Sequence, residues 1–390
     1  MDKAPASPAA PAHPLHHAVP PYLLMSMAAC DGAWEAPRSM LDLVAAPLAP
    51  GQGRGPDDET RRRIATRARQ TLLLDQALRH GRTTTHADPG RLPDPAGHLM
   101  PVVSDAHGAE TTPGTPARTE DRGFAGDHDV DSAYRGLKDI HTFLAELFTG
   151  FLPQGPQIVL RSTVHYGLHY SNAFWDGTQM VMGDGDAEIF NPFTSSLSVM
   201  AHELGHGLLQ HSTGLACQGQ AGALNESLAD VFGALVEQYV NGHDAAGASW
   251  LIGRGLFTDQ VRGTALRSMA APGTAYNDPV LGKDPQPGTM SGYVHTGADD
   301  GGVHLNSGIP NHAFHLFATA LGGNAWETAG SLWFNAVRAL PVDADFGTFA
   351  EETLLQARRE NGRGSPVERT LAYAWDAVGV VPRVLHPAAA

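Results

Sequence analysis

The chain has 390 residues, of which 42% are hydrophobic, and 41 acidic against 26 basic side chains give it a formal charge of −15. This length can bury a sizeable core in two or three structural units. Because the negative charge repels phosphate backbones and no run of about 18 apolar residues occurs, we expect neither a nucleic-acid partner nor a membrane span.

The first hundred residues are predicted to precede the main body. Residues 1–21 are rich in Ala, Pro and His without periodicity, which predicts disorder. Tyr22 to about Leu48 carries enough Leu, Met and Trp to dock elsewhere on the protein. One helix is expected from Asp58 to Arg79, with Gly-, Arg- and Pro-rich flanks. We therefore expect an N-terminal segment over 1–50 and a linker over 51–100.

The body is expected to begin with strand-rich structure. Apolar residues at helical spacing predict a helix from Asp131 to Phe148. The alternating run Ile158 to His165 predicts a strand. Asn172 to Trp175 and Gln179 to Met182 flank an Asp-Gly pair, which is the usual sign of a β-hairpin.

After Phe193 the pattern changes to helices, so a strand-rich lobe over 101–213 is followed by a helical lobe over 214–390. This order predicts an α+β fold with two lobes. The expected helices cover residues 195–213, 224–239, 306–321, 325–339, 346–359 and 367–377.

The first of these helices carries a metal-binding pattern. His202 and His206 stand four apart, so their imidazoles project from one face and can reach a common zinc ion, with Glu203 beside them. In a chain with 20 histidines this pattern alone can arise by coincidence. Others, such as His16 and His17, lie where no periodic structure surrounds them, so only placement can argue for a metal.

A third ligand is available on the next helix. Glu226, 20 residues after His206, lies among apolar neighbours, where an unpaired carboxylate is costly to bury. Asp230, one turn further, could accept the outer N–H of a ligating histidine. The alternative is that both are ordinary surface acids. The metzincin pattern is excluded, because Leu209 and Ser212 stand where it needs Gly and His.

Four motifs in order resemble the thermolysin family of metallopeptidases from about Val102 to Val380: Asn172 to Trp175, His202 to His206, Asn225 to Asp230, and Gly301 to Gly308. The segment Pro20-Pro21-Tyr22-Leu23-Leu24 is similar to the protealysin subgroup, whose precursors have a compact propeptide.

The resemblance implies catalytic roles. Glu203 matches the glutamate that assists attack by zinc-bound water and then protonates the leaving amine. His304 matches the histidine that stabilises the oxyanion, and Asp299 the acid that orients it. Taken alone, a histidine in a Gly-rich loop is more often structural.

The resemblance also implies a substrate-binding cleft. Asn172 and Ala173 match edge-strand positions that pair with a peptide backbone, and Arg267 matches an arginine that holds a substrate carbonyl. Six apolar residues match the lining of the primed-side pocket, which implies cleavage on the amino side of hydrophobic residues, although each could equally be core: Phe190, Phe193, Val199, Ile252, Leu256 and Leu266.

The chain departs from the family at two places. Cys217 stands where a tyrosine usually donates a second bond to the oxyanion, and a thiol is a weaker donor. Of the carboxylates that often hold paired calcium ions only Glu237 is present, beside the positions now taken by Ser198, Ser249, Leu251 and Arg254. We expect the paired calcium site to be absent.

The two cysteines, Cys30 and Cys217, are too few for a disulfide framework. In a latent precursor they could meet in a disulfide, or Cys30 could bind zinc as a thiolate. Inert core thiols are the alternative.

The sequence thus predicts a monomeric zinc endopeptidase made as a precursor, with protein or peptide substrates and its own propeptide bound in cis. An inactive zinc-binding interaction protein of the same fold is the alternative, and a zinc aminopeptidase is disfavoured because its Gly-x-Met-Glu-Asn-type motif is missing. The N-terminus has a single early Lys3 and a proline-interrupted apolar run, so secretion would use a route without a visible signal peptide. A cytoplasmic location is the alternative.

Overall fold

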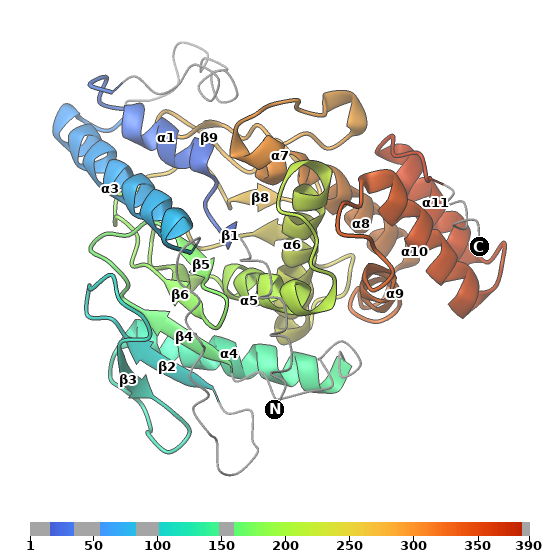
Figure 1. Ribbon diagram of the computed structural model, residues 1–390, viewed down its shortest axis with the longest axis horizontal. Helices are drawn as coiled ribbons and strands as arrows, with labels where there is room; N and C mark the ends of the chain where they lie inside the picture. Colours follow the sequence, from blue (N-terminus) through green and yellow to red (C-terminus); the bar gives the residue numbers. More distant parts are fainter. Residues whose placement is uncertain (1–15, 35–54, 83–100, 148–159, 384–390) are drawn as a thin grey trace, which may run out of the picture.

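The computed structural model describes residues 16–34, 55–82, 101–147 and 160–383. A twisted sheet occupies one side of the molecule and a group of helices the other, with two long helices between them (Figure 1). The α+β fold with a strand-rich and a helical part is therefore confirmed. None of the helices in the described ranges is long and apolar enough to cross a membrane.

The helices follow the predicted order closely. The one predicted at Asp58 to Arg79 runs to Arg82, and the central one at 224–239 begins five residues earlier, at Gly219. Their bounds are α1 Pro21–Ala29, α3 Asp58–Arg82, α4 His128–Leu147, α5 Leu197–Ser212, α6 Gly219–Asn241, α7 Asp299–Asn306, α8 Gly308–Leu321, α9 Thr328–Val337, α10 Phe346–Asn361 and α11 Pro366–Ala377, with short 3-10 turns at Phe193–Ser195 and Met290–Gly292.

One six-stranded sheet carries the first lobe, in the order β1-β5-β6-β4-β2-β3. The predicted hairpin is confirmed as β5 and β6, which pair antiparallel, whereas β4 pairs in parallel with both β6 and β2. The bounds are β1 His16–His17, β2 Val102–Asp105, β3 Thr115–Arg118, β4 Arg161–Val164, β5 Ala173–Trp175 and β6 Met180–Met182, and two-residue ribbons pair β7 Leu251–Ile252 with β8 Arg267–Ser268 and β9 Asn277–Asp278 with β10 Gly282–Lys283.

Helices α5 and α6 approach unusually closely, because small residues face each other. A Cβ atom added to Gly205 of α5 would lie 3.1 Å from Ala229 Cα, and one added to Gly233 of α6 would lie 2.3 Å from the Ser198 carbonyl oxygen. Glycine at these two positions lets the helix backbones touch. This contact sets α6 directly beside the face of α5 that carries the paired histidines.

The prediction that residues 1–21 are disordered is wrong from His16 onward. His16 and His17 form β1, which adds an antiparallel strand to the edge of β5 with His16 opposite Trp175 and His17 opposite Phe174. The strand then turns at Pro20 into α1, whose first residue is a proline, as suits a helix start. A pairing partner more than 150 residues away, rather than a local pattern, orders this segment.

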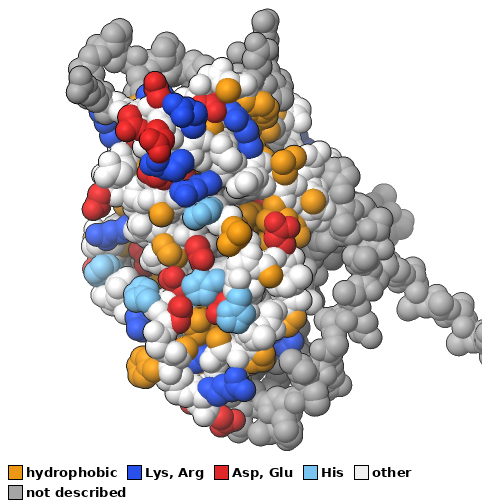
Figure 2. Space-filling model, turned by 90° about the vertical axis from the view of Figure 1, so that its left-hand side faces the viewer, with side chains coloured by type: hydrophobic (Ala, Val, Ile, Leu, Met, Phe, Trp, Pro, Cys, Tyr) orange, Lys and Arg blue, Asp and Glu red, His pale blue; other side chains and the backbone are white. Residues whose placement is uncertain are grey.

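Helix α3 lies on the side of the molecule where β1 and α1 lie, and it contacts both the N-terminal segment and the main body. Arg69 donates to the Ala28 carbonyl and pairs with Asp31, while Arg63 pairs with Glu188 and Arg67 donates to the Asp186 carbonyl. In Figure 2, which faces this side, basic and acidic side chains lie next to one another in the upper part of the surface. The N-terminal segment is thus held by α3 as well as by the sheet.

Candidate metal centre and peptide cleft

The two histidines of α5 and Glu226 of α6 converge on one buried point. The Nε2 atoms of His202 and His206 lie 3.0 Å apart, and the Glu226 carboxylate oxygens lie 3.6 and 3.8 Å from them. Donor atoms about 2.0–2.1 Å from one tetrahedral zinc ion are roughly 3.3 Å apart, so this set of two nitrogens and one carboxylate fits the metal. All three side chains are at most 2% exposed, so Glu226 is not a surface acid.

Glu203 follows His202 on α5, and its carboxylate is close enough to Glu226 for the two charges to interact. Its side chain is fully buried, and neither carboxylate oxygen has a hydrogen-bond partner. Burial raises the pKa of Glu203 well above its usual value, and the neighbouring Glu226 charge raises it further. A buried, unpaired carboxylate is costly, which argues that this position is kept for chemistry or for a ligand.

The rings of His202 and His206 each have a polar group behind them. His206 Nδ1 lies 2.8 Å from Asn225 Oδ1, and His202 Nδ1 lies 2.8 Å from Asp230 Oδ1. Such outer contacts fix the tautomer that leaves Nε2 free for a metal. Asp230 is fully buried, so the alternative that it is a surface acid is wrong.

Asp230 also forms a buried ion pair with Arg267. The guanidinium donates from Nε and Nη2 to the two carboxylate oxygens, each at 2.8 Å, and Asn311 donates a third bond at 2.9 Å. Burial acts to raise the pKa of Asp230, but the charges of Arg267 and His202 outweigh it and hold that pKa at about 2. Asp230 therefore links the metal centre to the peptide cleft.

His304 and Asp299 form a second buried pair on the other side of the centre. A run of left-handed backbone from Asp299 to Gly302 folds the Asp299 carboxylate back onto His304, where it accepts the backbone N–H at 2.9 Å and lies 2.6 Å from ring Nδ1. Burial acts to lower the pKa of His304, but Glu226 and Asp299 raise it to about 9. Nε2 is left facing the cleft, 3.5 Å from Glu226.

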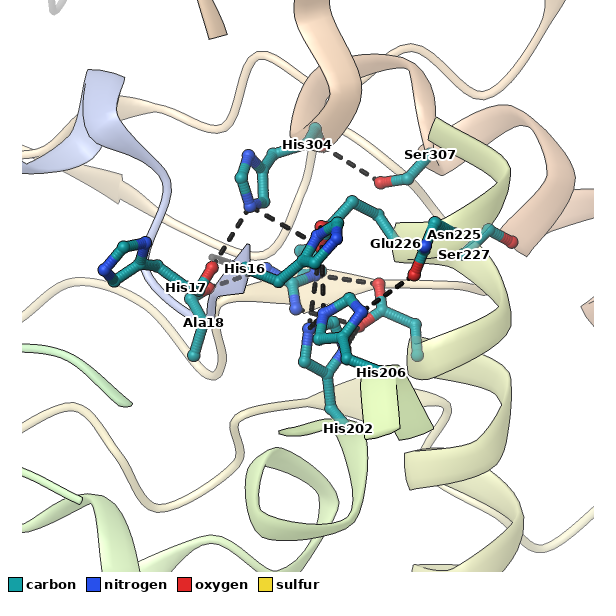
Figure 3. A network of polar contacts seen from close by, with 12 residues as sticks. His16, His17, Ala18, His202, His206, Asn225, Glu226, Ser227, His304 and Ser307 are labelled. Carbon is teal, nitrogen blue, oxygen red and sulfur yellow. Dashed lines mark hydrogen bonds and ion pairs between the residues drawn. The ribbon is translucent and has the colours of Figure 1, made fainter. Parts of the chain in front are cut away.

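The N-terminal segment runs past the convergence point as an extended peptide, with His16, His17 and Ala18 beside His304 and Glu226 (Figure 3). The Ala18 N–H donates to the Ala173 carbonyl, and the Asn172 side chain accepts the Val19 N–H. The Ala18 carbonyl accepts a bond from Arg267 at 3.1 Å, and the His17 carbonyl lies 3.1 Å from His304 Nε2. Asn172, Ala173, Arg267 and His304, all expected to touch a substrate, thus contact the backbone of one strand.

Sequence reasoning missed the residues that this segment contributes. His16 Nδ1 lies 2.8 Å from Glu226, and its Nε2 lies 3.1 Å from Cys217 Sγ. Asp75 of α3 also reaches the cleft, where it contacts Tyr170, Asn172 and His17. Burial raises the pKa of Asp75 to about 6. The tandem histidines just before Pro20-Pro21 were the available signal, but nothing in their local pattern indicated a partner.

The remaining expected residues lie around this cleft in different ways. Tyr22, Leu23 and Leu24 are buried in α1, next to buried Pro20 and half-buried Pro21. The six expected pocket residues are all buried in the main core, with the Phe190 and Phe193 rings 5.7 Å apart. Of the two alternatives for the cysteines, a contact of Cys30 with Cys217 or zinc is not found, because the Cys30 thiol donates to the Arg61 carbonyl of α3 and both cysteines are free.

Comparison with known proteins finds two matching family models. The model described as the thermolysin metallopeptidase catalytic domain matches residues 76–210, and that of the alpha-helical domain of the same metallopeptidases matches residues 213–380.

Individual proteins match over most of their length. An extracellular metalloprotease of Pectobacterium carotovorum is 46% identical over 321 residues, which span 81% of this chain and 90% of that protein. The protease PrtS of a Photorhabdus species is 41% identical over 80% of this chain and 84% of its own. The solved precursor of protealysin, a metalloproteinase from Serratia proteamaculans, superposes with a TM-score of 0.76 at 40% identity, covering 94% of this chain and all of that one.

Proposed function

The chain belongs to the thermolysin family of metallopeptidases, and we propose that it is the precursor of a zinc endopeptidase that cleaves extended polypeptides by means of Glu203. Its family, and relatives that match it over nearly their full length, show that it is a metalloendopeptidase. The observation that carries the mechanism is the convergence of His202, His206 and Glu226 beside the unpaired carboxylate of Glu203. Cleavage of N-terminally blocked peptides by the processed enzyme and by its Glu203→Gln variant tests the proposal.

His202, His206 and Glu226 would hold the zinc ion. When bound, zinc polarises a substrate carbonyl and lowers the pKa of a water molecule toward about 7. Glu203 accepts the proton from the attacking water and delivers it to the leaving amine nitrogen, which its buried and unpaired carboxylate supports. No other described carboxylate of the centre is free for this, because Glu226 is a ligand and Asp230 is paired with Arg267.

Four further residues act on the substrate, one on the carbonyl oxygen and three on the backbone. His304, oriented by Asp299, donates to the carbonyl oxygen as negative charge develops on it, which is worth about 3–4 kcal/mol for one such donor. Arg267, Asn172 and Ala173 hold the backbone of an extended peptide, as they hold the strand that contains Ala18. Backbone recognition of this kind makes little demand on substrate sequence.

We place the preference of the enzyme on the amino side of hydrophobic residues. This preference rests on the family positions of six residues, all apolar and all buried in this chain: Phe190, Phe193, Val199, Ile252, Leu256 and Leu266. Product masses from the blocked peptides decide this preference, and cleavage beside charged residues would exclude it.

Residues up to about 100 act as propeptide and linker until the chain is cut between α3 and β2, and the described stretch from His16 to Val19 is the part bound in cis at the active site. The contacts of Ala18 and Val19 with the cleft support this role. The enzyme works as a monomer with protein substrates, its lobes meeting near residue 213, and is secreted, in keeping with relatives named as extracellular proteases.

Replacing Cys217 with tyrosine is expected to raise kcat of the processed enzyme by about 10- to 100-fold, because the hydroxyl adds a donor to the oxyanion. The measurement belongs on the processed form, since in the precursor His16 contacts the Cys217 thiol. Cys217→Phe is the matched control, with the ring but no hydroxyl, and should give no gain. An unchanged or lower rate for Cys217→Tyr, with the fold intact, would refute the role.

The paired calcium site is proposed to be absent. Burial raises the pKa of Glu237, while a hydrogen bond from Ser198 and the charge of Arg254 act against that rise. A cationic guanidinium beside the one remaining carboxylate opposes a calcium ion there. Removing calcium with a selective chelator, with zinc kept saturating, is expected to change Tm by less than about 2 °C. A markedly larger fall would show that calcium binds.

A further inference from the structure

Resting on the proposed zinc function, we propose that His16 is a fourth protein ligand of the zinc ion in the precursor. The N-terminal segment would then close the coordination sphere of the metal, besides filling the peptide cleft. Catalytic zinc sites keep one position open, whereas sites with four protein ligands are closed and structural. The precursor would hold zinc in a closed site that processing opens.

The position of His16 carries this inference. One donor atom from each of His16, His206 and Glu226 can be chosen so that all three lie within 4.8 Å of one another. His16 Nδ1 lies 2.8 Å from Glu226 Oε1, closer than either histidine of α5 lies to that carboxylate. The His16 ring also stacks on the His206 ring, with centroids 4.1 Å apart and planes 17° from parallel. His16 therefore lies directly against two of the proposed ligands, and because nearly parallel rings cannot both point a nitrogen at one ion, its ring must rotate out of this stack when zinc binds.

The strand geometry explains why His16, and not its neighbour, points to the metal. Successive side chains of a strand point to opposite faces. With β1 paired to β5, His16 faces the centre, and His17 lies on the other face beside the Phe174 ring, with Nε2 3.3 Å from Asp75. Figure 3 shows the His17 ring turned away from the cluster that includes His16. The bond from the Ala18 N–H to the Ala173 carbonyl of β5, and that from the Val19 N–H to the Asn172 side chain just before β5, fix this register.

Cys217 gives the second ring nitrogen of His16 a partner. His16 Nε2 lies 3.1 Å from Cys217 Sγ, so one nitrogen faces the metal centre and the other faces the thiol. A contact on the outer nitrogen of a ligating histidine sets its tautomer and orientation. Cys217, which replaces the tyrosine usual in the family, therefore has a role in the precursor: it is a small residue that positions His16.

The test uses the full chain with Glu203→Gln, so that it stays unprocessed, loaded with zinc alone. Zinc K-edge X-ray absorption counts the imidazole ligands, and transfer of zinc to a chelator measures its release. His16→Gln is compared with His17→Gln, which removes a histidine from the opposite face of the same strand. We expect three imidazoles in the parent and in His17→Gln, but two in His16→Gln, with zinc released at least about 10-fold faster from His16→Gln.

The zinc X-ray absorption spectrum of the Glu203→Gln parent tests whether His16 is a ligand even if one of the other variants folds poorly. Two imidazoles in the zinc-loaded parent would overturn the role of His16 and leave the proposed function standing. Equal release rates from His16→Gln and His17→Gln, both folded by circular dichroism, would overturn it as well. A parent chain that binds no zinc at all would instead overturn the proposed function itself.

Discussion

Replacing Glu203 with glutamine is expected to lower kcat/KM of the processed enzyme by about 10²- to 10⁴-fold, the usual contribution of a general base. Glutamine has nearly the same size but cannot take the proton. Because His202, His206 and Glu226 are unchanged, zinc should remain bound at one ion per chain. The full-length variant should also accumulate uncut if processing depends on this same active site.

The measurement is hydrolysis of N-terminally blocked peptides, with zinc content and intact mass determined on the same samples. The variant can be processed in trans by tagged wild-type enzyme that is then removed. Glu352→Gln is the matched control, because Glu352 is also a buried carboxylate with an unpaired oxygen, but lies on α10 in the helical lobe. It should leave kcat/KM unchanged.

Two results would contradict the assignment of Glu203. A zinc-loaded Glu203→Gln enzyme that keeps activity within about fivefold of wild type is too active to have lost its general base. A processed, zinc-loaded wild-type chain that cleaves no blocked peptide would favour the alternative of an inactive zinc-binding protein. Cleavage of free peptides only would instead indicate an aminopeptidase.

Replacing Asp230 with asparagine is expected to lower the free energy of unfolding by about 3–5 kcal/mol, because it leaves the buried Arg267 guanidinium without a counter-charge. Arg267 is 1% exposed and makes two 2.8 Å bonds to Asp230, so water cannot replace the lost carboxylate. The same change removes the charged partner of His202 and should weaken zinc binding about 10- to 100-fold.

The stability is measured by urea unfolding of the zinc-free chain in the Glu203→Gln background, and zinc affinity by competition with a chelator. Asp376→Asn, at an exposed position of α11, is the control and should stay within about 0.5 kcal/mol of the parent. Adding Arg267→Leu to Asp230→Asn should recover part of the loss, since no buried charge then remains unpaired.

The loss should also depend on pH in a defined direction. The folded-state pKa of Asp230 is held at about 2, below its ordinary value of 3.8, so its stabilisation is fully present above about pH 4. It is lost as pH falls from about 4 through 2, at which pH about half of the wild-type carboxyls are protonated in the folded state. The gap between wild type and Asp230→Asn should therefore shrink over this range, and a gap that stays constant would assign the cost to shape rather than charge.

Much of this protein follows from local sequence. Helical spacing of apolar residues located α3 to α6 and the helices from α8 onward, because the pattern repeats within each helix, whereas it did not locate α7. His202 and His206 face one point because four residues are about one helical turn. The Asp-Gly pair between β5 and β6 located their hairpin for the same reason, since the turn lies within a few residues of both strands.

Short strands with distant partners were not predicted. β2 has only four residues and pairs in parallel with β4, nearly 60 residues away. The two strands are therefore not joined by a short turn whose sequence could have predicted the pairing. The left-handed turn from Asp299 to Gly302 was likewise visible only as a Gly-rich loop, although it sets Asp299 against His304.

The sequence by itself determined which groups can bind zinc and carry out proton transfer, because these depend on residue type and on spacing within single helices. Only the tertiary structure decided that His16, rather than Cys30, reaches the metal centre. His16 reaches the centre because β1 pairs with the edge of β5, and Cys30 stays away from it because α3 holds α1. Both contacts join parts of the chain that are distant in sequence, so no local residue pattern predicts them.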